Sequence, residues 1–193
     1  MRFRGECFRA HDPRWSWSPL SGAGAALKGR RFNWAGLETL YLSLSLETAF
    51  REVSAGFAHR LSPYVLCSYD VDCEDVADLR DDAGRAALGV TLDAIACAWG
   101  DALMAGREPA SWDVVRRLIA AGHAGALVPS FAHRATADDR NLVLWRWGPA
   151  PPHKVKVYDP SGRLPKNQLS WRYIRRPVQL AMRPTAAASA SRP

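Results

Sequence analysis

The stretch LETLYLSLSLETAFREV, residues 37–53, contains a strand pattern followed directly by a helix pattern. Its first half alternates leucines with Thr, Tyr and Ser, which is the period-two pattern of a strand with one buried face. Ser45 then suits a helix N-cap, and Glu47 suits the positive end of the helix that follows. Glu52 lies on the flank of the apolar stripe of this helix. The stretch therefore predicts a strand over 37–45 that leads into an amphipathic helix.

Further elements are predicted on both sides of this stretch. Helix patterns cover 91–105 and a segment from Ser111, taken as its N-cap, to Gly122, where a left-handed residue ends it. The first 25 residues, rich in Trp, Pro and Gly, are predicted to form a loop, and 78–84 a polar turn. Strand patterns cover 64–71, 126–130, 141–147, 154–159 and 171–176.

The order of these elements predicts the fold class. Strands and helices interleave without a strict βαβ rhythm, so we expect an α+β (mixed α/β) single domain built on a mixed sheet. The domain is assigned residues 1–176. Residues 177–193 are of low complexity and are predicted to be a disordered Ala/Ser/Pro tail.

Composition excludes several classes of protein. The chain has 193 residues, of which 48% are hydrophobic and 23% charged, and this is globular rather than disordered composition. No apolar run is long enough for a membrane helix, and MRFRGECFRAHDPRW carries charges where a signal peptide has its apolar stretch. We therefore expect a cytoplasmic protein without a membrane segment. The four cysteines lack CxxC spacing and are predicted to be small buried hydrophobes, not disulfides or metal ligands.

The net charge of +7 is concentrated at the C-terminal end. Residues 1–139 hold 15 Lys and Arg against 18 Asp and Glu, whereas residues 140–193 hold 11 against one. A solvated basic face explains this, and a basic nucleic-acid-binding module is the alternative. No repeated aromatic platform and no helix-turn-helix or RRM pattern supports that alternative.

Familiar catalytic motifs are missing from the sequence, whereas one compact stretch holds candidate residues. There is no GxGxxG, Walker loop, GxSxG elbow or HExxH, and the five histidines have no ligand spacing. Arg31 precedes a turn-forming Asn33-x-x-Gly36, and a fixed guanidinium suits a phosphate or pyrophosphate. Tyr41 and Ser43 share the less apolar face of the strand, where a phenol ring can stack on a heterocycle. The residues alone leave a plain structural role for Arg31, Tyr41 and Glu52 equally open.

A set of motifs in chain order resembles the RES domain family, which is named for its Arg, Glu and Ser. The resemblance covers roughly residues 5–150. It departs from the family at Phe32, where Trp is frequent, at Trp34-Ala35, where a Pro-containing pair is usual, and in the extended region after Trp147. The motifs are Arg9 in CFRA, Ser21-Gly22-x-Gly24-Ala25, Arg31-Phe32-Asn33-x-x-Gly36, Leu40-Tyr41-Leu42-Ser43, Ala49-x-x-Glu52-Val53, Asp78-Leu79, Gly122-x-x-Gly125, Val128-Pro129-Ser130 and Asn141-Leu142-Val143-Leu144.

The resemblance implies a toxin of a bacterial type II toxin–antitoxin system with a largely antiparallel sheet core similar to ADP-ribosyltransferases. Such toxins degrade NAD by cleaving the nicotinamide–ribose bond, as NAD glycohydrolases or NAD phosphorylases, with water or inorganic phosphate as acceptor. NAD is then a substrate, and no cofactor or metal is expected. The implied partner is an Xre-like helix-turn-helix antitoxin that covers the active site, with operator DNA bound only through that antitoxin. Transfer of ADP-ribose to a cellular protein is the alternative within the enzyme class.

The resemblance also assigns roles to residues. Glu52 stabilises the cationic ribosyl centre that forms as nicotinamide leaves. Arg31 holds the pyrophosphate, and Tyr41 stacks on nicotinamide or its ribose. Ser130 binds that ribose or the amide. Supporting positions in NAD binding are Ser43, Arg9 and Asn141.

Overall fold

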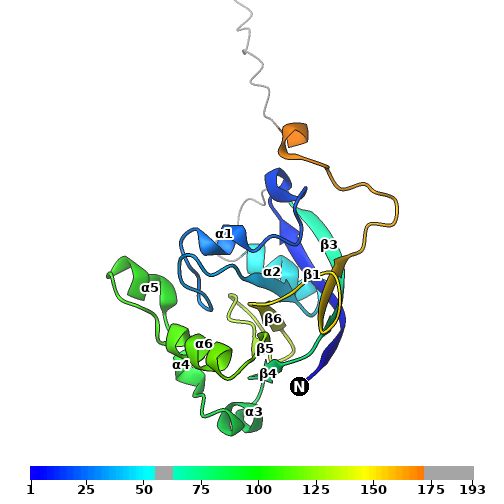
Figure 1. Ribbon diagram of the computed structural model, residues 1–193. Coiled ribbons are helices and arrows are strands. Elements are labelled where there is room, and N and C mark those ends of the chain that lie inside the picture. The colour runs from blue at the N-terminus through cyan, green and yellow to red at the C-terminus, as the bar shows by residue number, and fades with distance from the viewer. Residues whose placement is uncertain (55–62, 172–193) are drawn as a thin grey trace, which may run out of the picture.

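The protein is described by a computed structural model, and the structure describes residues 1–54 and 63–171 (Figure 1). One seven-stranded sheet has the order β4-β5-β6-β2-β1-β3-β7. All neighbouring strands are antiparallel except β4 and β5. The strands are β1 (Phe3–His11), β2 (Leu40–Ser43), β3 (Val65–Cys73), β4 (Val76–Asp78), β5 (Gly125–Pro129), β6 (Arg140–Leu144) and β7 (His153–Val157).

Helices lie mainly to one side of this sheet. Figure 1 shows α3, α4, α5 and α6 gathered beside β4 and β5, while α1 and α2 lie nearer β1. The helices are α1 (Ala23–Ala26), α2 (Leu46–Ser54), α3 (Asp82–Ala87), α4 (Leu92–Ala96), α5 (Trp99–Met104) and α6 (Ala110–Ala120), and η1 (Pro13–Trp15) and η2 (Gln168–Trp171) are short 3₁₀ turns. The predicted α+β domain with a mixed, largely antiparallel sheet is therefore confirmed.

The alternation in β2 divides the hydrophobic core into two clusters, one on each face of the sheet. Leu40 and Leu42 are fully buried in one cluster with Cys7, Tyr69 and Val71. The other cluster lies under α4 and α6 and contains Phe32, Ile95, Val115, Val128 and Val143, with Tyr41 packed against it. The predicted strand pattern is thus correct, although β2 itself is shorter than 37–45.

The strand register brings polar residues together at one end of this second face. Ser43 pairs with Asn141, and Val128 pairs with Asn141 from the other side. Because side chains two positions apart share a face, Tyr41, Ser43 and Asn141 all point toward the face that carries Phe32. Ser130 follows directly after β5 at the same end.

Helix α2 begins where the sequence predicts. The Thr48 amide donates to Ser45 Oγ at 3.0 Å, which is the expected N-cap contact, and Glu47 lies in the first turn.

Gly122 has the predicted positive φ, of 90°, after α6. Three of the four cysteines are buried, as predicted, and all four are free. Within residues 1–54 and 63–171, no helix has the length and apolarity to cross a membrane.

Four predicted elements differ from the structure. The N-terminal segment contains the nine-residue strand β1 instead of a loop, and the predicted turn at 78–84 contains the start of α3. The predicted helix 91–105 is two helices, because Cys97 is extended, with a ψ of 151°. Ser111 lies inside α6, which starts at Ala110, and its hydroxyl donates to the carbonyl of Arg31. Trp171 ends η2, and the rest of the predicted strand 171–176 and the tail 177–193 lie outside the described residues.

Candidate active site

Glu52 is the centre of a polar cluster that joins three segments of the chain. Its Oε1 accepts a hydrogen bond from Ser130 Oγ at 2.7 Å and another from Asn141 Nδ2 at 2.5 Å. Ser130 is 9% exposed, whereas the glutamate is exposed to solvent. The cluster therefore fixes one carboxylate oxygen against the protein and presents the group to solvent.

Each donor to Glu52 is oriented by a further contact. Ser43 Oγ donates to Asn141 Oδ1 at 2.8 Å, which turns the amide nitrogen of Asn141 toward the carboxylate. The Ala132 amide donates to Ser130 Oγ at 3.2 Å, so the serine proton points to Glu52. Ser43 is 5% exposed. Ser43 thus lies beside Asn141, its partner across the β2–β6 pair, and Asn141 contacts the glutamate directly.

Arg31 lies on the same face, in the turn before β2. Its Nη1 donates to the carbonyls of Ile95 and Cys97 at 3.1 and 2.6 Å, and its guanidinium carbon lies 4.5 Å from the centre of the Phe131 ring. Burial lowers the pKa of Arg31, and the nearby Glu52 carboxylate acts in the opposite direction. Among the described residues no carboxylate forms an ion pair with Arg31. A positive charge that is half-buried and not ion-paired with a carboxylate favours an anionic ligand.

Tyr41 braces the turn that carries Arg31. Its hydroxyl donates to Asn33 Oδ1 at 2.9 Å and accepts from the Phe32 amide at 3.1 Å. Burial raises the pKa of Tyr41 well above its usual range, so the phenol stays protonated. Asn33 Nδ2 in turn donates to the carbonyls of Ala25, Trp34 and Leu37. Both hydrogen-bond partners of the Tyr41 hydroxyl are therefore inside the protein, and only the ring is left for contact with a ligand.

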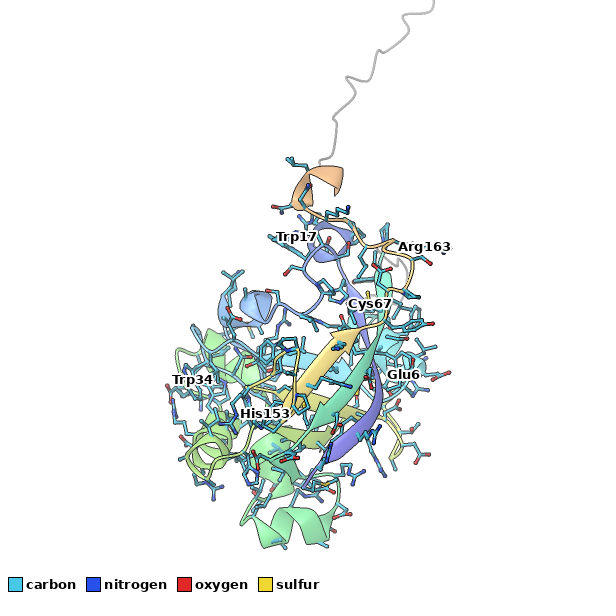
Figure 2. All side chains as sticks on the ribbon, turned by 45° about the vertical axis from the view of Figure 1, so that its right-hand side comes forward. Glu6, Trp17, Trp34, Cys67, His153 and Arg163 are labelled. Atoms are coloured by element: carbon cyan, nitrogen blue, oxygen red, sulfur yellow. The ribbon has the colours of Figure 1, made fainter. Side chains whose placement is uncertain are left out.

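Arg9 is not part of the Glu52 cluster. By strand alternation it shares a face with Cys7 and pairs across the sheet with Cys67, on the face opposite Ser43 and Asn141. Its Nη1 donates to the carbonyls of Pro19 and Ser21, and burial lowers its pKa. Figure 2 shows Cys67 in the right-hand half of the molecule, below Arg163, and Trp34, three residues after Arg31, at the left edge.

The sequence did not single out three further parts of this site. Phe131 supplies the ring beside Arg31, the backbone of Ile95 and Cys97 supplies its acceptors, and Asp139 ties α2 to the loop after Ser130. A phenylalanine after a strand and an Asp-Asp pair in a loop carry no distinctive local signal. As for metals, the described Cys, His, Asp and Glu residues include no group of three placed to hold an ion.

The basic residues near the C-terminal end are partly neutralised. Lys154 Nζ pairs with Asp70 at 2.7 Å, and Arg146 lies 3.6 Å from Asp75. Two of the six Lys and Arg residues between positions 140 and 171 therefore pair with acidic residues of β3 and the turn after it.

Comparisons with known proteins identify the family and a similar fold. The family model described as the RES domain matches residues 6–167. The crystal structure of the M. tuberculosis MbcT–MbcA toxin–antitoxin complex contains a similar fold, with a TM-score of 0.56 and 23% sequence identity, over 82% of this chain and 84% of that chain. A search of curated proteins finds no match. Since the family model covers most of the chain, including every residue of the Glu52 cluster, the protein belongs to the RES domain family.

Proposed function

We propose that the protein is the toxin of a toxin–antitoxin pair and that it acts by cleaving the bond between nicotinamide and ribose in NAD. Membership of the RES domain family supports this, as does the similar fold in the MbcT–MbcA toxin–antitoxin complex. The observation that carries the chemistry is the arrangement of Glu52, an exposed carboxylate whose Oε1 is held by Ser130 and Asn141.

The held carboxylate suits a transition state that develops positive charge. As the C1′–N bond breaks, its electron pair leaves with nicotinamide, which becomes neutral, and the ribose gains oxocarbenium character. A fixed negative group next to that carbon stabilises the transition state more than the ground state. Because nicotinamide is cationic in NAD, no general acid has to protonate the leaving group. The site therefore needs no histidine.

Arg31 supplies binding energy away from the bond that breaks. Its Nη1 is occupied by two carbonyls, and in this proposal the remaining guanidinium N–H groups bind the pyrophosphate. The ring of Tyr41 lines the floor beside nicotinamide or its ribose, and Ser130 contacts the ribose or the amide. Ser43 acts through Asn141, which it orients.

The acceptor completes the reaction. Water or inorganic phosphate attacks C1′ through an oxygen atom, and its proton leaves to solvent. The products are ADP-ribose or its 1″-phosphate, together with nicotinamide. A carboxylate beside the sugar can orient the acceptor by accepting its hydrogen bond. Attack by a protein side chain instead of a small acceptor would make the protein a mono-ADP-ribosyltransferase.

Mass analysis of the products of NAD tests the proposal and separates these acceptors. The purified protein is incubated with NAD alone, with added phosphate, and with a cell extract. If water is the acceptor, we expect nicotinamide and ADP-ribose in all three incubations. If phosphate is the acceptor, we expect no turnover with NAD alone, and nicotinamide with ADP-ribose phosphate once phosphate is added. In neither case do we expect an ADP-ribosylated protein with the cell extract. Glu52→Gln should lose most turnover, whereas the matched variant Glu47→Gln, on the exposed first turn of α2, should keep it. Full turnover by Glu52→Gln would contradict the role of this carboxylate.

The proposed partner is an Xre-like helix-turn-helix antitoxin that covers the Glu52 cluster in the cytoplasm, and operator DNA is bound through it. Co-expression with the product of a neighbouring helix-turn-helix gene tests this part. Growth arrest by the protein alone and relief by the co-expressed protein support the pairing. Growth arrest that persists in its presence would exclude that gene product as the antitoxin.

A further inference from the structure

We propose that Asp139 is a positioning residue for Glu52, holding helix α2 against the loop between β5 and β6 so that the glutamate meets Ser130 and Asn141. The inference rests on the function proposed for the Glu52 cluster. It adds a residue that acts through the glutamate and does not itself touch substrate.

The side chain of Asp139 is buried, at 4% exposure, and it is bound by both elements. From α2, Thr48 Oγ1 donates to Oδ1 at 2.7 Å, and Arg51 forms an ion pair with Oδ2. From the loop, the amide and the hydroxyl of Thr136 donate to Oδ2 at 2.7 and 2.9 Å. One carboxylate therefore receives hydrogen bonds from the helix and from the loop that faces it.

The backbone of Asp139 fixes the other side of the cluster. Its carbonyl accepts from the Ser130 amide at 2.8 Å, and its amide donates to the carbonyl of Thr136 at 3.1 Å. Asn141 follows two residues later, at the start of β6. Of the two donors to Glu52, Ser130 is thus hydrogen-bonded to the backbone of Asp139, and Asn141 lies two residues after it in the chain.

The helix contacts of Asp139 lie next to Glu52 in the chain. Arg51 immediately precedes the glutamate, and Thr48 lies one helical turn before it. The hydrogen bonds from Thr136 and Thr48 lower the pKa of Asp139 far below its usual range, so the carboxylate is charged at neutral pH. The charged carboxylate thus receives contacts from α2 and from the loop that carries the donors to Glu52. This matters because a displacement of about 1 Å can cost about a hundredfold in rate.

Four variants test the role of Asp139 through turnover. Asp139→Asn keeps the shape of the side chain but removes its charge, and Asp138→Asn is the matched control at the exposed neighbouring residue. Arg51→Gln breaks the same contact from the half-exposed helix side, in case Asp139→Asn fails to fold, and Arg51→Lys should restore it. We expect Asp139→Asn and Arg51→Gln to lower kcat for NAD by about tenfold to a hundredfold with little change in KM. In a Glu52→Gln background the same changes should have no further effect.

A nuclear magnetic resonance measurement decides the point without any NAD. The side-chain amide of Asn141 reports its hydrogen bond to Glu52, and Glu52→Ala gives the signal of the broken contact. We expect Asp139→Asn and Arg51→Gln to move the Asn141 signal toward that position, while Asp138→Asn and Arg51→Lys leave it in place. An unmoved signal in Asp139→Asn and Arg51→Gln overturns the inference, and so does a moved signal with unchanged kcat. Absence of NAD turnover in the parental protein would refute the proposed function alone, because the amide signal would still show whether Asp139 positions Glu52.

Discussion

Replacing Arg31 by lysine should separate binding of the pyrophosphate from binding of the nicotinamide. The guanidinium reaches two carbonyls through Nη1 and lies over the Phe131 ring, so the remaining N–H groups keep one direction. A lysine carries one compact ammonium, which cannot hold the carbonyls of Ile95 and Cys97 and a pyrophosphate in the same fixed fork. The expected loss is one charged hydrogen-bonded contact with the ligand.

The size of this effect follows from the type of contact. A hydrogen bond to a charged group contributes about 1.5–3 kcal/mol, which corresponds to a dissociation constant about tenfold to a hundredfold higher. Isothermal titration with ADP-ribose and with nicotinamide measures both halves of the substrate without any reaction. Arg31→Lys should raise the dissociation constant of ADP-ribose by that factor and leave that of nicotinamide unchanged. Arg30→Lys, at the exposed neighbouring residue, should change neither dissociation constant. Equal weakening of both ligands by Arg31→Lys would refute the assignment.

Three further changes should have defined results. Burial lowers the pKa of His11 to about 3, so below about pH 6.5 the unfolded chain binds a proton on this histidine that the folded chain does not bind. The free energy of unfolding should therefore fall by about 1.4 kcal/mol per pH unit as the pH drops from about 6.5 toward 3. In urea titrations His11→Gln should remove this slope, and the exposed control His133→Gln should retain it. Gly125→Ala should lower the free energy of unfolding by about 1–3 kcal/mol, because its Cβ would lie 2.4 Å from the Val143 carbonyl oxygen, and an unchanged urea midpoint would contradict this. Asn141→Ala should reduce NAD turnover about tenfold or more by removing a donor to the glutamate, and parental kinetics would show that the contact is not needed.

The local patterns predicted the centre of the fold but not its first strand. The alternating leucines of β2 and the N-cap at Ser45 are signals that depend only on residues close in the sequence, and both were predicted correctly. Strand β1 lies inside the sheet, yet it carries a half-buried Arg9 and a buried His11. Those side chains are satisfied by the carbonyls of Pro19 and Ser21 and by the Tyr69 hydroxyl, which lie outside the strand. The pattern of polar and apolar residues within the strand does not predict these hydrogen bonds.

Distant contacts also explain the errors among the helices. Ser111 resembles an N-cap because its hydroxyl could accept a hydrogen bond from a backbone amide. In the structure this hydroxyl instead donates a hydrogen bond to the carbonyl of Arg31, 80 residues away. The sequence 91–105 contains good helix formers, whereas the structure extends Cys97 and turns its carbonyl to Arg31. In both cases the residue at the helix boundary makes a hydrogen bond with Arg31, and helix propensity takes no account of such a distant contact.

The candidate site was predicted in part for the same reason. The family motifs named Glu52, Ser130 and Asn141, and the structure brings these three together. Order along the chain could not reveal that Ser43 pairs with Asn141 or that Arg9 faces the other side of the sheet. Their roles in binding NAD remain predictions.

The distances along the chain between the members of the Glu52 cluster bear on its synthesis. The glutamate precedes its two donors by 78 and 89 positions, and about half of the domain lies between it and Asn141. During translation the carboxylate leaves the ribosome long before Ser130 and Asn141, so a nascent chain cannot complete the cluster until that synthesis is nearly finished. A gene interrupted between the codons for residues 52 and 130 should yield a truncated product that carries the glutamate without either donor.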